Sequence, residues 1–242
     1  MTATVSAVRP RQDRLRAAPL AWFALAGVVV YVGIDVALAF LRPRYSLLYN
    51  AESDYGRGPW YWLMDLNFLL RCALSLALAG ALARSFPGRA RGGLALLVTW
   101  AVCSGLLAFS ADDPKGYPAT ASGRIHLVLA FIAFTCMAAA AIVISVNLRS
   151  GPSSIAPSSI ALPSIALPLS IAGGAAYLLL GVAARHRHAP GGLYERIFLG
   201  LELLWIAVVA ARIATGRIPD DLSGTGSGRP GALSPGKPPA RG

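Results

Sequence analysis

The stretch Ala51–Arg71, AESDYGRGPWYWLMDLNFLLR, decides what kind of fold this chain forms. It begins as a polar segment, passes through a Gly/Pro turn and an aromatic cluster, and enters an apolar helix that carries Asp65, Asn67 and Arg71. Aromatic clusters of this kind are typical of the membrane–water interface. Ionisable residues in a hydrocarbon-facing helix are costly, so they usually face the interior of a bundle and often mark function. The stretch therefore predicts a polar loop that leads into a membrane helix with a polar inner face.

The composition of the whole chain agrees with this interpretation. Of the 242 residues, 55% are hydrophobic and 14% are charged, whereas soluble domains carry about 25% charged residues. The net charge of +11 comes largely from arginines in the N-terminal arm, in short loops and in the C-terminal tail. Arginines that flank apolar segments are typical topology determinants of membrane proteins. We therefore expect the lipid bilayer to be the main partner of the chain, and we expect no nucleic-acid binding.

Several apolar segments are long enough to cross a bilayer, which takes about 20 residues. They predict an all-α, polytopic integral membrane bundle of six transmembrane helices. A disordered basic arm is expected before the bundle and a disordered Gly/Pro-rich tail after it. A low-complexity Pro/Ser repeat leaves the start of the fifth helix open, because prolines disfavour a regular helix. The predicted segments are the arm at 1–19, helices at about 20–41, 59–82, 93–111, 124–148, 165–184 and 193–214, the repeat at 152–172, and the tail at 215–242.

The distribution of charge predicts the orientation of the helices. An even number of spans puts both termini on one side of the membrane. The excess of arginine in the arm, in the 84–92 loop and in the tail predicts that this side is cytoplasmic. The chain is then a multi-pass protein of the cell membrane, and the 112–123 loop lies outside. With this orientation, nearly every ionisable residue within the spans falls in the outer half of the membrane.

The polar residues of this outer half are candidates for a ligand-binding site. They could bind a small molecule or a lipid head group in a cavity that opens outward. Alternatively, they could serve only as polar contacts that fix helix pairing. An arginine in mid-membrane needs a partner, so we expect Arg71 to pair with Asp35, with Glu202 or with both. The ligand-binding candidates are Asp35, Asp54, Asp65, Asn67, Arg71, Glu195, Arg196 and Glu202.

A second interpretation is enzymatic. Ser122 and His126 are spaced i, i+4, so a hydroxyl and an imidazole could meet near the start of the fourth helix. Asp112 or Asp113 could complete the cluster of a membrane-embedded hydrolase. The histidines and cysteines lack the spacing of a zinc or haem site, so no metal and no cofactor is predicted. A third interpretation is a small-solute transporter that uses the intramembrane carboxylates. The oligomeric state is left open.

Three segments of the chain together resemble a known family. SDYGRGPWYWLMDLNF precedes a long apolar helix, GRIH opens the fourth predicted helix, and GGLYERI opens the sixth. This combination resembles a six-helix bacterial and archaeal membrane family, the domain of unknown function 998, over about residues 21–213. The resemblance implies the fold and a membrane localisation, and it implies no activity. The matching positions are Ser53, Asp54, Gly58, Asn67, Asp112, Gly123, His126, Glu195 and Arg196.

Overall fold

The computed structural model describes residues 8–88, 90–114, 116–149, 161–186 and 188–215. Over these residues the chain is all-α, and six of its helices are long and apolar enough to cross a membrane. The predicted fold class is therefore confirmed. The long helices are α1 (Val8–Leu41), α2 (Tyr61–Ser85), α3 (Arg91–Leu106), α4 (Ala121–Arg149), α5 (Ala161–Ala183) and α6 (Gly191–Ala214), and two short 3-10 helices are η1 (Glu52–Gly56) and η2 (Leu107–Phe109).

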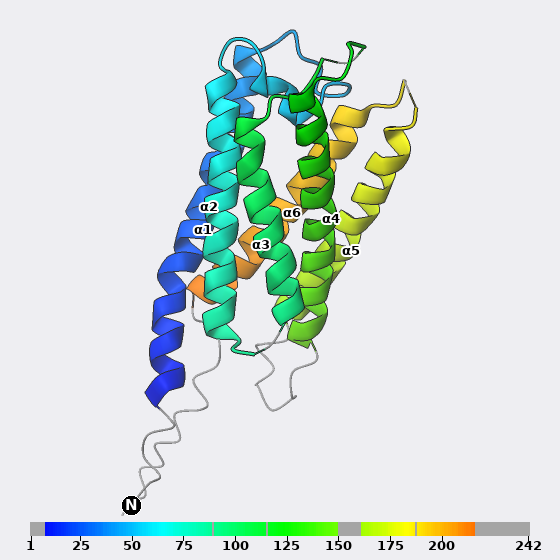
Figure 1. The fold of residues 1–242 in the computed structure, drawn as a ribbon. Coiled ribbons are helices and arrows are strands. Elements are labelled where there is room, and N and C mark those ends of the chain that lie inside the picture. Colours follow the sequence, from blue (N-terminus) through cyan, green and yellow to red (C-terminus); the bar gives the residue numbers. More distant parts are fainter. Residues whose placement is uncertain (1–7, 89, 115, 150–160, 187, 216–242) are drawn as a thin grey trace, which may run out of the picture.

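The long helices form a closed ring. Each one packs against the helices that precede and follow it in the chain, and α6 returns to pack against α1. The start of α1 and the end of α6 lie at the same end of the bundle (Figure 1). The opposite end carries the α1–α2 loop (residues 42–60), the α3–α4 loop (residues 110–120) and the α5–α6 loop (residues 184–190), and we call it the loop end.

Helices approach one another closely where small residues meet. Ala21 of α1 and Ala77 and Ala81 of α2 are buried in one apolar cluster. A Cβ atom placed on Gly27 of α1 would lie 2.9 Å from the Cβ of Leu74 in α2, so no larger residue fits there without a shift. Within a bilayer, close van der Waals packing of this kind is a main source of helix association.

Some buried polar side chains serve helix pairing. The indole nitrogen of Trp100 in α3 donates a hydrogen bond of 3.0 Å to the hydroxyl of Ser75 in α2. The indole nitrogen of Trp205 in α6 donates one of 2.9 Å to the hydroxyl of Ser145 in α4. All four side chains are buried. A tryptophan can be buried in this way because its N–H finds a partner on the neighbouring helix.

The α1–α2 loop is held in place by an arginine at the end of α1. A guanidinium nitrogen of Arg42 donates hydrogen bonds to the carbonyl oxygens of Arg57, at 2.5 Å, and Pro59, at 2.7 Å. Gly58 has a φ of +70°, and a Cβ atom there would lie 3.3 Å from the same guanidinium group. This position therefore favours glycine for two reasons: the positive φ disfavours other residues, and a Cβ atom would lie close to the Arg42 guanidinium group. The loop thereby brings η1 onto the loop end.

The helix boundaries differ from the predicted ones in places. The first helix begins at Val8 rather than near residue 20, and the fifth begins at Ala161 and includes Pro168. A proline costs a membrane helix only one backbone hydrogen bond, which neighbouring groups can replace. Residues 1–7 of the predicted arm, 150–160 in the connector and 216–242 of the predicted tail lie outside the described residues.

Candidate functional site

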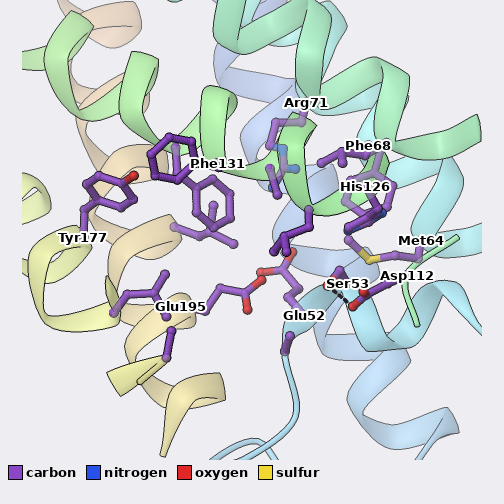
Figure 2. Close-up of a pocket in the computed structure, with 18 of the residues that line it drawn as sticks. Glu52, Ser53, Met64, Phe68, Arg71, Asp112, His126, Phe131, Tyr177 and Glu195 are labelled. Atoms are coloured by element: carbon purple, nitrogen blue, oxygen red, sulfur yellow. Dashed lines mark hydrogen bonds between the residues drawn. The ribbon is translucent and has the colours of Figure 1, made fainter. Parts of the chain in front are cut away.

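A cavity of about 300 Å³ opens at the loop end of the bundle. Its walls come from η1, α2, α4, α5 and α6, with contributions from Leu107 and Asp112 after α3. The side facing η1, α2 and α6 carries the charged groups Glu52, Arg71 and Glu195, which we call the polar wall. The opposite side comes from α4 and α5 and is mainly apolar and aromatic, and we call it the apolar wall. Figure 2 shows both walls.

Two side chains of the polar wall, Arg71 and Glu52, are joined in a hydrogen-bonded chain by Tyr31, which does not itself line the cavity. A guanidinium nitrogen of Arg71 donates to the hydroxyl oxygen of Tyr31 at 3.2 Å. The same hydroxyl donates its proton to a carboxylate oxygen of Glu52. All three residues are buried, from three different elements, α1, η1 and α2. The phenol thus links a cation to an anion that lies farther away.

The ion pairs expected for Arg71 are not formed. Neither Asp35 nor Glu202 has a carboxylate oxygen within 4.0 Å of its guanidinium group. Instead, the guanidinium carbon lies 4.8 Å from the ring centre of Trp100, 5.2 Å from that of Phe68 and 5.8 Å from that of Tyr31. Aromatic faces attract cations, so rings and a phenol take the place of the expected carboxylates.

Glu195 has a different environment from Glu52. It lies in the first turns of α6, is 9% exposed and lines the cavity. Among the described residues its carboxylate accepts no hydrogen bond and forms no ion pair. Figure 2 shows this carboxylate pointing toward that of Glu52 inside the cavity. A buried carboxylate without a partner is costly, which makes Glu195 the most unusual group at the site.

Two more candidates, Asp112 and His126, also line the cavity. The hydroxyl of Ser53 donates to a carboxylate oxygen of Asp112 at 3.2 Å. The Nδ1 atom of His126 lies 2.6 Å from the carbonyl oxygen of Ser110. A carbonyl only accepts, so Nδ1 carries the proton, and in the neutral ring Nε2 is left as an acceptor. Asp112 and His126 therefore have fixed orientations.

The serine and the second aspartate of the enzymatic interpretation lie away from these groups. The hydroxyl of Ser122 donates to the carbonyl oxygen of Ala111 at 3.1 Å, and it has no hydrogen bond to His126. Asp113 accepts hydrogen bonds of 2.8 Å from both the backbone N–H and the hydroxyl of Thr120. Neither Ser122 nor Asp113 lines the cavity. Asp113 thus fixes the chain just before α4 begins.

Asp54 and Arg196 connect the α1–α2 loop internally and to α6. Asp54 forms an ion pair with Arg57 and accepts a hydrogen bond of 2.9 Å from the amide of Asn50. One guanidinium nitrogen of Arg196 donates to the carbonyl oxygens of Leu47, at 3.1 Å, and of Asn50, at 2.7 Å. Asp54 therefore stabilises the loop internally, and Arg196 holds the loop against α6, next to the cavity rather than in it.

Tyr55 of η1 belongs to the same contact region. Its ring centre lies 5.7 Å from the guanidinium carbon of Arg196. Burial raises the pKa of the Tyr55 phenol, and the nearby charge of Arg196 partly opposes this shift. Its hydroxyl consequently stays neutral near pH 7, and the stacked pair adds to the attachment of the loop.

The remaining candidates do not line the cavity. Asp35 and Asp65 are half-buried, and one oxygen of Asp35 has no partner among the described residues. The amide of Asn67 and both carboxylate oxygens of Glu202 are buried without hydrogen-bond partners in the described part of the chain. Glu202 packs so tightly against Gly173 of α5 that a Cβ atom there would overlap its carboxylate. The structure thus brings Arg71, Asp112, His126 and Glu195 together and leaves these four outside.

The sequence did not single out several residues that line the cavity or hold the side chains of its polar wall. Glu52 stands in the quoted stretch, but a loop carboxylate gives no sign that it will fold into the bundle. Tyr31 lies in an apolar run, where a tyrosine is not distinguished from other interfacial or core aromatics. Phe131 and Tyr177 also lie in apolar runs, and only the packing of the helices makes them cavity residues. Within the described residues, no three or more His, Cys, Asp or Glu side chains are grouped so that they could hold a metal ion.

The family described as "Protein of unknown function (DUF998)" matches residues 25–212 of the chain. The chain belongs to this family. The match covers the six helices from within α1 to near the end of α6 and confirms the resemblance found in the sequence. No curated protein and no solved structure shows a significant match to the chain. The family match and the six apolar helices together indicate a multi-pass membrane protein and leave the activity to be inferred from the cavity.

Proposed function

We propose that this protein binds a small amphiphile, a lipid or lipid-like molecule, in the cavity at the loop end. The polar part of the ligand contacts the polar wall, and its apolar part lies against α4 and α5. On the asymmetry of arginine, we further propose that the termini are cytoplasmic and that the cavity faces the outer leaflet of the cell membrane.

One observation carries this proposal. Leu127 and Phe131 line the cavity and are also 69% and 64% exposed on the outside of the bundle. Across from them, Gly181 of α5 lines the cavity and is exposed as well. Residues that face both the cavity and the outer surface of the bundle form the rim of the cavity. This rim lies within two membrane spans, so the opening faces lipid as well as the loop end.

Aromatic rings pack together at the end of the cavity farther from the loops, which favours binding over passage through the bundle. The rings of Phe134 and Phe198 have centres 5.0 Å apart, and those of Tyr177 and Phe198 have centres 5.5 Å apart. The hydroxyl groups of Tyr177 and Thr135 lie 2.6 Å apart and join α5 to α4 by a contact that is exposed. A hydrolase function has less support, because the hydroxyl of Ser122 donates to a backbone carbonyl oxygen outside the cavity.

The proposal is tested by filling the rim. A Cβ atom on Gly181 meets nothing within 4 Å, so Gly181→Leu places a side chain in open space without a clash. Gly200 of α6 is also exposed with nothing within 4 Å, and it does not line the cavity, which makes Gly200→Leu the matched control. In a helix interior both changes improve helix propensity.

The measurement is isothermal titration calorimetry of the full chain in dodecyl maltoside. Three single-chain probes share an octyl tail and differ in the head: octyltrimethylammonium, octanesulfonate and octyl glucoside. We expect at least one probe to bind the wild type, and Gly181→Leu to weaken that binding by about tenfold or more, a change of about 1.4 kcal/mol. Gly200→Leu should bind as the wild type does. Absence of binding by all three probes, or equal losses in both variants, would contradict the proposal.

A further inference from the structure

The charged groups of the polar wall are not equally available to a ligand. Arg71 is covered by three rings and donates to Tyr31, which in turn donates to Glu52. The positive charge of Arg71 is therefore balanced by Glu52 through one intervening phenol. Asp112 accepts a hydrogen bond from Ser53. Of the carboxylates that line the cavity, only Glu195 lacks a hydrogen bond or ion pair among the described residues.

The lining of the cavity also holds more carboxylates than guanidinium groups. Among the described residues that line it, the carboxylates are those of Glu52, Asp112 and Glu195, and the guanidinium group is that of Arg71. Two ionised carboxylates that face each other repel, and a cation placed beside them relieves this repulsion. When Glu195 is ionised, the unmatched charge in the cavity is therefore negative, and its complement is a cation.

The apolar wall supplies the second half of a cation site. Phe131, Phe134 and Tyr177 line the cavity together with Glu195. Figure 2 shows the rings of Phe131 and Tyr177 beside the cavity on the side away from Asp112. Aromatic rings attract ammonium groups, and quaternary ammonium ligands are commonly recognised by several rings at once. A carboxylate with aromatic neighbours fits a cation that carries apolar substituents better than it fits a small hydrated ion.

From these contacts we infer that the ligand of the cavity is a lipophilic organic cation, an ammonium compound with an apolar tail, and that Glu195 is its counter-ion. This inference rests on the proposed function and adds the charge class of the ligand. The ammonium group lies against Glu195 and the rings, and the tail leaves between α4 and α5. Arg71 and Glu52 stay bonded to Tyr31 and set the shape of the polar wall.

The test uses the same three octyl probes and asks about selectivity between heads. In the wild type, octyltrimethylammonium should bind more tightly than octyl glucoside and octanesulfonate. Glu195→Gln keeps the shape of the side chain and removes its charge, and it should weaken binding of the ammonium probe by roughly 10- to 100-fold. Binding of octyl glucoside to this variant should change little, which also shows that the variant is folded.

Two further variants separate charge from general effects. Glu202→Gln changes the same residue type in the same helix, buried and unpartnered but outside the cavity lining, and should leave all three affinities unchanged. Phe131→Leu keeps an apolar side chain without a π face and should weaken binding of the ammonium probe alone, by about threefold to tenfold.

Three other outcomes would contradict the inferred charge class, the role of Glu195 or the proposed function itself. Equal affinity for the three probes, or a preference for octanesulfonate, would overturn the cation class and leave amphiphile binding standing. A preference for the ammonium probe that survives Glu195→Gln would overturn the role of Glu195. If none of the probes binds the wild type, both the cation class and the proposed function fail.

Discussion

The hydroxyl of Tyr31 links two charged groups of the polar wall, Arg71 and Glu52. It accepts a hydrogen bond from Arg71 and donates one to Glu52, and these three residues are 2%, 2% and 3% exposed. Tyr31→Phe removes this oxygen and keeps the ring, so the aromatic contact with the guanidinium group remains. The change therefore isolates the two hydrogen bonds to charged groups.

The expected cost follows from what is left behind. A hydrogen bond to a charged group contributes about 1.5–3 kcal/mol, whereas side-chain hydrogen bonds in membrane helices average only about 0.6 kcal/mol. Because two bonds are lost and two buried charges lose a partner, we expect Tyr31→Phe to lower the free energy of unfolding by about 2–4 kcal/mol. A second variant, Tyr31→Phe with Glu52→Gln, should lose at least about 1 kcal/mol less than the sum of the single changes, since the buried charge is then absent.

The assay is equilibrium unfolding of the full chain, in detergent with increasing dodecyl sulfate, followed by far-UV circular dichroism. Tyr177→Phe is the matched control. Its hydroxyl contacts Thr135, whose own hydroxyl also bonds the carbonyl of Phe131, and the contact is exposed. We expect this control to cost about 0.5 kcal/mol. If Tyr31→Phe cost no more than Tyr177→Phe, the chain from Arg71 to Glu52 would have no energetic role and the reasoning would be refuted.

Three further predictions follow from the loop end. Arg196→Gln removes the charged donor that holds the α1–α2 loop, so amide hydrogen exchange in that loop should accelerate while exchange in α3 stays the same; equal rates in the loop would count against this contact. Gly123→Ala places a Cβ atom into the carboxylate of Asp113 and should lower the free energy of unfolding by about 1–3 kcal/mol. In the control Gly92→Ala, the added Cβ atom meets nothing within 4 Å, so the free energy of unfolding should not fall. For the orientation, a maleimide that cannot cross membranes should label Tyr117→Cys on intact cells and should not label Pro87→Cys until the cells are opened; the reverse pattern would invert the proposed topology.

In the labelling experiment, a wild-type sample is a sufficient control for labelling of the native cysteines. The native cysteines lie inside helices, at Cys72, Cys103 and Cys136, and Cys103 is buried. Tyr117 is 73% exposed at the loop end, and Pro87 is exposed in the loop between α2 and α3. The two positions thus report opposite ends of the bundle.

The fold class was predictable because it depends on local properties of the chain. In a bilayer every backbone polar group must be satisfied within the protein, so long apolar segments form helices whatever their neighbours are. Length and hydropathy of each segment therefore determined an all-α bundle of six spans. The sequence also placed Glu195, Asp112 and His126 near the same end of the bundle as the loop before Arg71, because depth in the membrane follows from position along each helix.

The pairing of these side chains could not be predicted in the same way. The partner of Arg71 depends on the rotation of α1 and α2 about their axes and on which ring fills the space between them. Tyr31 occupies the place that was expected for Asp35, since it faces Arg71 across the helix contact while Asp35, one turn further along α1, lies only half-buried. Likewise, Asp113 looked like a catalytic carboxylate and turned out to bond Thr120 ahead of α4.

The sequence by itself thus determined that this is a six-helix membrane protein in which most ionisable residues within the spans gather toward one end. Only the tertiary structure decided that Glu52 folds in from a loop to join Tyr31, and that Glu195 faces a cavity without a partner. The physical reason is the distance along the chain over which each interaction acts. Hydropathy and backbone hydrogen bonding act within a segment of about 20 residues, whereas the neighbours of a buried charge come from separate helices and are fixed only when those helices pack.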